Sequence, residues 1–461
     1  MNRKAAITVS AVMVIIAAAS MVALFHHDGG DSGTEGMYRG FDGYYEYTTS
    51  GSTSETYAST LDRVVSDSDV LFLQSALEGY PLKTIGAGSL SGCSSGILVV
   101  PATVETAEDG AFEGYGGTVV FLGDVPEGVH ADGNRFLTLD VNGGTVETAE
   151  DSGDGWSVTY LLIGGCAAVM EAEGTGSLDV PEAVCSADGT MNTVTMVGCD
   201  SFRGSSFVSV TLPATLERIC TRAFYGCDSL EDVRFPESLV SVEDEAFRHC
   251  TGLRSVDLGG VRFIGFEAFR DCRSITDILI PDSVTYMGAG VFYICSSAER
   301  VMMGAGVTAI PDRAFGYCSS LGEVIIEGRV SSVGSYAFAM CGLLVSISLP
   351  DAMEVGSNAF TECRMLSEVT LGAVETMGSN AFGNCRSLTA IVLPETLAFM
   401  GESVFLDCRS LEDIWFNGPM PVMADDSLSG TDATIHVSER YIGSWDGFDG
   451  TVVPFPEDQI S

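Results

Sequence analysis

Phenylalanine recurs through the second half of the chain at a nearly fixed spacing, which restricts the possible folds more than any other feature. The recurring residues, separated by 22 or 23 positions, are Phe202, Phe224, Phe247, Phe269, Phe292, Phe315, Phe338, Phe360, Phe382 and Phe405. A unit of this length is too short to bury its own apolar side, so neighbouring units have to stack and share one core. The spacing therefore predicts an array of stacked repeats.

Cysteine forms a second column in the same register. It stands three residues after nine of the ten phenylalanines, as Cys227, Cys250, Cys272, Cys295, Cys318, Cys341, Cys363, Cys385 and Cys408. Free cysteine behaves as a small buried hydrophobe, and equivalent side chains of stacked strands run parallel about 4.8 Å apart. Disulfides need closer, twisted pairs, so we interpret the column as unbridged core packing. Outside it, Cys166 with Cys185 and Cys199 with Cys220 are candidate bridges.

Each unit ends in a strand-like pattern. Examples are Leu253-x-x-Val256-x-Leu258 and Leu388-x-x-Ile391-x-Leu393, in which the last two apolar positions alternate. Alternation of this kind is typical of a strand with one buried face. Stacking of such units predicts a β-rich α/β solenoid, a right-handed coil whose strands form one parallel sheet.

Two segments show the repeat most clearly. Ile264 to Cys272 reads I-G-F-E-A-F-R-D-C, and Met377 to Cys385 reads M-G-S-N-A-F-G-N-C. These segments resemble the repeat of the BspA-like (treponemal-type) leucine-rich-repeat family of surface proteins. The resemblance covers residues 197–416 and reaches back to residues 84–112. It implies a leucine-rich-repeat fold and extracellular adhesion or ligand binding, and it supplies no catalytic residues.

Composition and register divide the chain into five expected parts. These are a signal anchor or transmembrane helix (1–27), a flexible stalk (28–60), a β-rich region with degenerate repeats (61–196), ten regular leucine-rich repeats (197–416), and a C-terminal cap and tail (417–461).

The N-terminal segment directs export. Arg3 and Lys4 precede an uncharged run from Ala5 to Phe25. This run is long enough to span a bilayer, which takes about 20 apolar residues. Basic residues on the short side place that end in the cytoplasm, so we expect a single-pass membrane protein with its C-terminal region outside the cell. The alternative is a signal peptide cleaved near Ala17 to Ala19, which would release a secreted protein.

The net charge excludes one class of partner. The chain carries 63 acidic and 22 basic side chains, for a formal net charge of -41. Such a polyanion repels nucleic acid. The expected partners are instead an extracellular protein or glycan, and the cell's own membrane through the N-terminal helix.

No segment carries a convincing catalytic or metal-binding pattern. Residues 92–96 match G-x-S-x-G but lie in a repeat turn, and that motif needs a strand–turn–helix context to make a nucleophile elbow. The five histidines are scattered. Residues 150–155 are acidic but lack the ligand alternation of a calcium loop, which leaves loose calcium binding as an open alternative. We therefore predict a non-enzymatic protein without catalytic residues, cofactor or metal.

The position between the last two apolar residues of each strand points onto the exposed sheet face. In three consecutive units it is apolar, as Leu279, Met302 and Ile325. Exposed contiguous apolar surface often marks an interaction site, so we predict ligand binding by these residues with the flanking Arg300 and Glu323. A covering segment or simple β-propensity would also explain the apolar residues. A self-associating coat or stalk component is the alternative function.

Overall fold

The computed structural model describes residues 34–40, 43–50, 58–65, 70–73, 76–77, 80–91, 93, 97–100, 103–113, 115, 118–121, 126, 129, 135–138, 147–163, 165–424 and 426–456. The chain forms two compact units, the first made of Met1–Thr148 with Leu161–Ile163 and the second of Ala149–Tyr160 with Gly164–Ser461. The predicted membrane segment, residues 1–27, lies outside the described residues. Within the described ranges no helix is long and apolar enough to cross a membrane.

The first unit is built from short strands in two sheets. One sheet contains β1 (Thr34–Gly40), β2 (Gly43–Ser50), β3 (Ala58–Val65), β5 (Ala76–Leu77), β6 (Tyr80–Ile85) and β8 (Thr106–Ala107); the other contains β4 (Val70–Phe72), β7 (Ile97–Val100), β9 (Thr118–Phe121) and β10 (Arg135–Thr138). The strands β3, β6 and β8 pair in parallel, as do β4, β7, β9 and β10.

Part of the segment predicted as a flexible stalk is a hairpin in this unit. The strands β1 and β2 pair antiparallel, and β2 continues antiparallel onto β3. The stalk prediction for residues 28–60 is therefore wrong over these strands. Tyrosine-rich β2 has the aromatic composition that favours strands, and its Tyr47 side chain is buried in the core of this unit.

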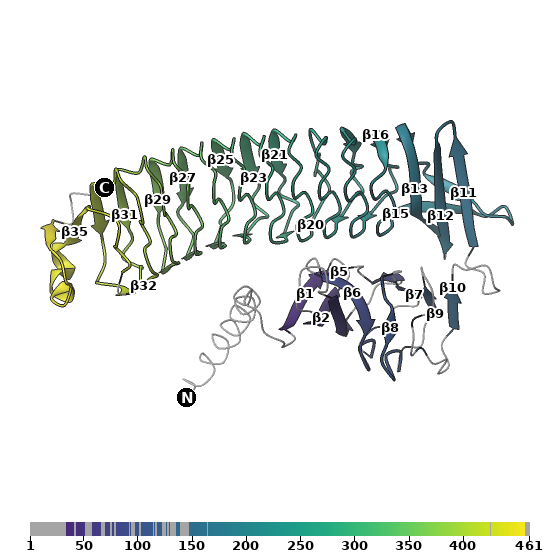
Figure 1. Ribbon diagram of the computed structural model, residues 1–461, viewed down its shortest axis with the longest axis horizontal. Helices are drawn as coiled ribbons and strands as arrows, with labels where there is room; N and C mark the ends of the chain where they lie inside the picture. The colour runs from purple at the N-terminus through teal and green to yellow at the C-terminus, as the bar shows by residue number, and fades with distance from the viewer. Residues whose placement is uncertain are drawn as a thin grey trace. The chain divides into compact units, whose positions relative to one another are not determined.

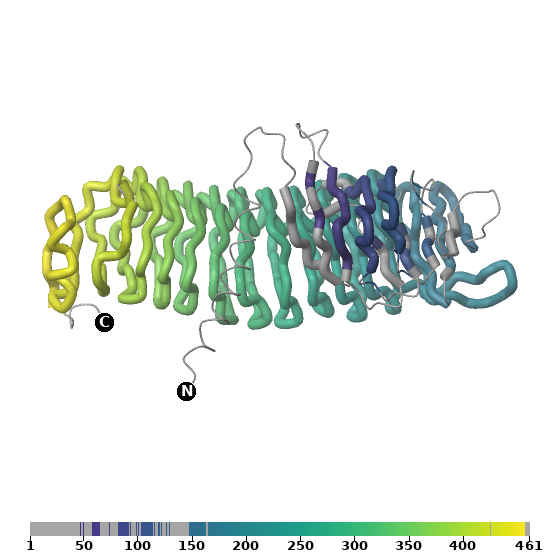
Figure 2. The backbone as a smooth tube through the Cα atoms, turned by 90° about the horizontal axis from the view of Figure 1, so that it is seen from below, coloured from purple at the N-terminus to yellow at the C-terminus, as the bar shows by residue number. Residues whose placement is uncertain are grey.

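The second unit is a stack of coils with strands along two opposite edges (Figure 1). It begins with most of β11 (Glu147–Gly153) and of β12 (Trp156–Ile163), followed by β13 (Cys166–Asp179) and β14 (Ala183–Cys185). The long strand β13 starts both edges, because Cys166–Val169 pairs with β15 (Met191–Val197) and Thr175–Asp179 pairs with β16 (Ser206–Thr211). Figure 2 shows the successive coils of this unit side by side.

One edge carries two-residue strands that pair in parallel within two groups, one that ends at β22 and one that begins at β24. After β15 they are β17 (Arg218–Ile219), β19 (Ser241–Val242), β20 (Phe263–Ile264), β22 (Tyr286–Met287), β24 (Ala309–Ile310), β26 (Ser332–Val333), β28 (Glu354–Val355), β30 (Thr376–Met377), β32 (Phe399–Met400) and β34 (Val422–Met423). The coils approach closely here, because a Cβ atom on Gly288 would stand 2.3 Å from the backbone nitrogen of Phe266. Glycine is the residue that permits such an approach.

The opposite edge carries the longer strands. After β16 they are β18 (Asp232–Arg234), β21 (Asp277–Ile280), β23 (Arg300–Met303), β25 (Glu323–Ile326), β27 (Ser346–Leu349), β29 (Glu368–Leu371), β31 (Ala390–Leu393), β33 (Asp413–Phe416), β35 (Thr434–Ser438) and β36 (Val452–Phe455). The 3-10 helix η1 (Glu439–Trp445) connects the last two of these strands, and its Trp445 packs against Phe416 with ring centroids 4.6 Å apart.

Two parts of the predicted fold class need correction. The sequence predicted one parallel sheet, whereas the coils of the second unit carry parallel strands along two opposite edges, divided into several sheets, since the apolar column five residues before each phenylalanine is itself a short strand. The predicted helical content is also wrong, because η1 is the one helix in the described residues. Each return segment places two residues in the left-handed region, such as Glu267 at φ 49° and Asp271 at φ 65° on either side of Phe269, which a right-handed helix does not tolerate.

The phenylalanine column is the core of the array. Its ten rings are buried and stack consecutively, with centroids of neighbouring rings 4.5 to 5.9 Å apart. Each ring therefore contributes to the stability of two neighbouring coils, as expected for a fold in which repeats contact only their neighbours.

The cysteine column packs beside these rings through a repeated contact. Each of its nine thiols donates a hydrogen bond of 2.9 to 3.3 Å to the carbonyl oxygen of the phenylalanine in the preceding coil. Burial raises the pKa of the Cys318 thiol to about 12, so this thiol stays protonated and can donate. All fourteen cysteines are free thiols, and neither candidate bridge outside the column is formed.

Asp312 provides a test of pH-dependent stability. Its carboxylate accepts a hydrogen bond from the backbone nitrogen of Ser335 in the next coil, and burial raises its pKa. A raised pKa in the folded state means that the folded chain binds the proton more tightly than the unfolded chain. The free energy of unfolding therefore falls as pH rises from the ordinary aspartate pKa of about 3.9 through the raised value.

We expect Asp312→Asn to be more stable than the wild type at pH 7 and to lose this part of the pH dependence. The asparagine oxygen keeps the bond to Ser335 without a buried charge. Denaturant unfolding of both proteins, from about pH 4, near the ordinary carboxyl pKa, to about pH 7, measures the difference in the free energy of unfolding. Asp282→Asn is the matched control, because Asp282 makes the same kind of bond to Ala305 but is exposed. Equal stability gains in both variants would contradict the burial argument.

Candidate binding face on the long strands

The three apolar residues predicted as a binding strip lie side by side in the structure. Leu279 on β21 is paired in register with Met302 on β23, which is paired with Ile325 on β25. Successive side chains of a strand point to opposite faces, so these three point outward while Ile278 and Val301 are buried beneath them. Leu279 is 48% and Ile325 37% exposed, and Met302 is half-buried between them. We call these three residues the apolar strip.

A charged row runs beside the apolar strip on the same three strands. Arg300 is in register with Asp277 on one side and with Glu323 on the other. The Arg300 guanidinium lies 2.7 Å from an Asp277 carboxylate oxygen, with the two side chains 45% and 44% exposed. An exposed pair of this kind contributes little to stability. The row therefore presents alternating charges to solvent, and the structure brings all five predicted residues onto one face.

The same row of positions is polar in the two coils that follow the apolar strip, and it holds the half-buried Val392 beside Trp415 further along the array. In the coils that follow, it holds the exposed Ser348 and Thr370. At the C-terminal end, Trp415 stacks on His436 of β35 with ring centroids 3.8 Å apart, so its ring is covered by the next strand. The apolar strip is thus limited to three coils.

The long ladder is interrupted directly after the apolar strip. The strands β21, β23 and β25 form one sheet, and β27 pairs with β29 in a separate sheet. Within the described residues no pairing joins β25 to β27, although the phenylalanine column continues across this point with Phe315 stacked on Phe338 at 5.4 Å. We call the interruption between β25 and β27 the seam.

A change in coil length explains the seam. The connection between each long strand and the following short strand has five residues after β21, β23 and β25, as in Glu327 to Ser331, but four residues after β27 and β29, as in Pro350 to Met353. Strands pair within each group and not across the change. The shorter connection displaces the strand relative to its neighbour, so the hydrogen-bonding register is lost. The phenylalanine interval shortens from 23 to 22 at the same place, a signal that sequence reasoning missed.

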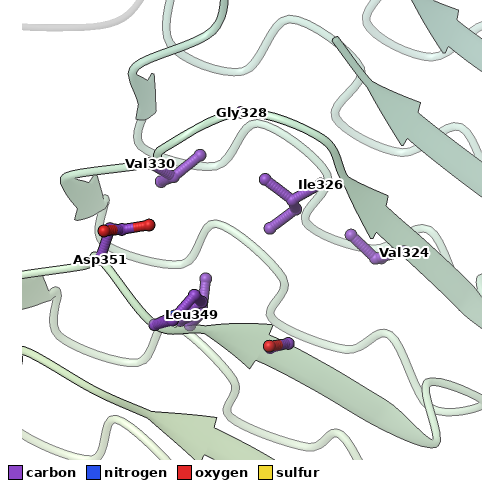
Figure 3. A pocket seen from close by; sticks show the side chains of 8 residues that line it. Val324, Ile326, Gly328, Val330, Leu349 and Asp351 are labelled. Carbon is purple, nitrogen blue, oxygen red and sulfur yellow. The ribbon is translucent and has the colours of Figure 1, made fainter. Parts of the chain in front are cut away.

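At the seam, inward-pointing side chains of the core are partly exposed. Val324 and Ile326 are half-buried, whereas the equivalent side chains of β21 and β23 are fully buried. A pocket of about 110 Å³ lies between the coils of β25 and β27, lined by Val324, Ile326, Gly328, Val330, Ser348, Leu349, Pro350 and Asp351. Figure 3 shows the side chains of Ile326, Val330 and Leu349 around this space, with Asp351 at one end. We call it the seam pocket.

Sequence reasoning also missed a buried ion-pair cluster in the return segments. Glu245 lies 2.8 Å from Arg222 and 3.2 Å from Arg248, and Glu267 lies 2.7 Å from Arg248 and also pairs with Arg270. Nine of the chain's 22 basic residues fall between Arg203 and Arg273, and this concentration was the available signal. Because the carboxylates are buried, the cluster connects neighbouring coils and does not form an accessible site.

His249 extends this cluster on its outer side. Its Nδ1 atom lies 2.7 Å from an Asp271 oxygen. Partial burial acts to raise the pKa of Asp271, but hydrogen bonds from Arg273 and His249 outweigh it and lower that pKa. Asp271 therefore remains ionised and holds both partners.

The described residues of the two segments considered for chemistry form no assembled site. Of residues 92–96, the structure describes Cys93, and the rest lie outside the described residues. Residues 150–155 form the exposed end of the β11–β12 hairpin. Among the described side chains, no group of three or more histidine, cysteine, aspartate or glutamate residues is placed to hold a metal ion.

The repeat array matches a known family model. Six copies of the BspA type leucine-rich-repeat region match residues 195–322, 258–367 and 308–434, which together span more than half of the chain. The chain belongs to the BspA-type leucine-rich-repeat family. BspA-type proteins are typically found at the cell surface, and the family supports a general role in protein interaction and is generally non-enzymatic.

Solved structures similar to this BspA-type chain come from several bacteria. A leucine-rich cell surface protein from Faecalibacterium prausnitzii A2-165 is 20% identical, with a TM-score of 0.37, and the match covers 64% of this chain and 96% of that one. The leucine-rich-repeat protein of T. pallidum is 26% identical, with a TM-score of 0.37 and coverage of 45% and 86%. A leucine-rich-repeat protein from Bacteroides ovatus is 19% identical, with a TM-score of 0.32 and coverage of 65% and 98%. No curated protein matches the chain significantly.

Proposed function

We propose that this chain is an exported, membrane-anchored cell-surface protein that binds a protein ligand on the face formed by β21, β23 and β25. The observation that carries the proposal is the apolar strip, three apolar side chains in register and accessible to solvent on consecutive strands. Contiguous exposed apolar surface is costly in water and marks interaction sites. Methionine and arginine, here Met302 and Arg300, are enriched at protein interfaces.

In this proposal, the charged row determines which partner the face accepts. The order Asp277, Arg300, Glu323 alternates in sign, and an interface of complementary order fixes the register of a partner more than it adds affinity. Self-association into a coat is the less favoured alternative, since a net charge of -41 repels copies of the chain from one another.

The test uses random linear peptides displayed on phage and selected on the purified full-length chain. We expect the selected peptides to bind at least about ten-fold more weakly when Leu279, Met302 and Ile325 are all replaced by serine, because buried apolar anchors dominate interface energetics. The matched control replaces Leu343, Met365 and Val422 by serine, three exposed apolar residues outside the face. Circular dichroism should be unchanged in both variants.

Two results would overturn this proposal. One is peptide binding that is equal in the wild type and the strip variant. The other is a wild-type chain that binds glycans on an array but selects no peptide. In that case the ligand would be a glycan and not a protein.

A further inference from the structure

The seam pocket is an opening toward the core between two coils of the array. Elsewhere on the face, the inward side chains of β21 and β23 are sealed by the neighbouring strand. At the seam, Val324 and Ile326 lose this cover on the β27 side. Partly exposed apolar walls around a concave space are the usual setting of a binding pocket.

The two ends of the seam pocket differ in polarity. Ile326, Val330 and Leu349 provide apolar walls, and Asp351 is the one charged residue among the eight that line it. In Figure 3 the Asp351 carboxylate lies beside Val330 at one end of the space. An occupant that satisfies both ends has an apolar stem and a cationic tip.

The size of the seam pocket limits the occupant to one side chain. Its volume is about 110 Å³, and an apolar cavity of about 150 Å³ holds a benzene molecule. Lysine and arginine bury their methylene stems along apolar surface while the charged head seeks a polar partner. The acidic chain, with a net charge of -41, also attracts basic partners over a longer range.

We infer that the seam pocket binds a single lysine or arginine side chain of the protein that lies on the apolar strip. This inference rests on the proposed function, because Ile325 of the strip stands between Val324 and Ile326 of the pocket on β25. A partner segment that covers the strip therefore reaches the seam, where its cationic side chain enters between the two coils and its head pairs with Asp351.

A small probe tests the pocket without the partner. N-acetyl-lysine N-methylamide should shift the methyl resonances of Ile326, Val330 and Leu349 in the full-length chain and leave those of Leu279 unchanged. The norleucine analogue, which has the same stem without the charge, should bind several-fold more weakly. Asp351→Asn should remove this preference. Equal binding of both probes, or no shift at the pocket methyls, would overturn the inference.

A second variant fills the pocket from its rim. Ser348→Phe places a ring at a lining residue whose own side chain is exposed, and Thr370→Phe is the control at the paired position of the next coil, outside the pocket. We expect peptides selected on the wild type to contain lysine or arginine and to bind about ten-fold more weakly to Ser348→Phe but not to Thr370→Phe. Peptides that need the apolar strip but tolerate Ser348→Phe and Asp351→Asn would overturn the pocket inference while leaving the proposed function in place.

Discussion

Replacing Phe338 with alanine is expected to destabilise the array by about 3–5 kcal/mol, the usual cost of removing a buried phenylalanine. The ring of Phe338 is fully buried and stacks on Phe315 and Phe360, with both centroids 5.4 Å away. Its loss leaves a cavity that the neighbouring rings cannot fill without moving their own coils. The stability of a repeat array is a sum over neighbouring units, so the loss concentrates in the coils that contact Phe338.

Hydrogen exchange resolved along the chain measures this result. The protection of backbone amides against exchange should fall most in the coils that contain Phe315, Phe338 and Phe360. Amides in the coils near Phe224 should stay protected. Leu343→Ala is the control in the same coil, because Leu343 is 53% exposed and surface substitutions usually change stability by less than about 0.5 kcal/mol. A uniform loss of protection along the whole array would contradict the nearest-neighbour account.

Replacing Glu245 with alanine is expected to cost a similar amount, about 3–5 kcal/mol, for an electrostatic reason. Glu245 is 1% exposed and pairs with both Arg222 and Arg248. Its removal leaves two largely buried guanidinium groups with fewer carboxylate partners. Arg222 loses the carboxylate that lies 2.8 Å away, whereas Arg248 keeps its ion pair with Glu267. Denaturant unfolding of wild type and variant gives the change in the free energy of unfolding.

An exposed pair of the same type is the control for this substitution. Arg254 and Glu231 lie 3.0 Å apart with side chains 68% and 43% exposed, and breaking such a pair costs less than about 1 kcal/mol. Equal losses in Glu245→Ala and Glu231→Ala would show that burial of the ion-pair cluster has no energetic consequence.

The sequence predicts the core of this fold well because the core repeats. The column of Phe315 recurs in all ten regular repeats and the column of Cys318 in nine of them, and the structure buries both columns as predicted. The outward direction of Leu279 and Ile325 also follows from strand alternation and is confirmed. Their role in binding remains a prediction.

The remaining features depend on differences between coils, which a repeat pattern averages out. The seam follows from one residue fewer after β27 than after β25, and the pocket depends on how far that shift separates the two strands. The ion-pair cluster depends on Arg222, Glu245 and Arg248 meeting across two neighbouring coils, which spacing alone does not reveal. The turn conformations that replace helix, such as the left-handed φ of Asp271, occur mostly at residues other than glycine and give no clear signal in the sequence.

The origin of the seam has a consequence for how such surfaces change over generations. The phenylalanine and cysteine columns continue across the seam without interruption, since Cys341 still bonds to the carbonyl oxygen of Phe315. A deletion or insertion of a single codon in a surface turn is therefore enough to open or close a gap in the wall while the core is conserved. In this array, the position of the seam pocket therefore depends on turn length, whereas its chemistry depends on the side chains that line it.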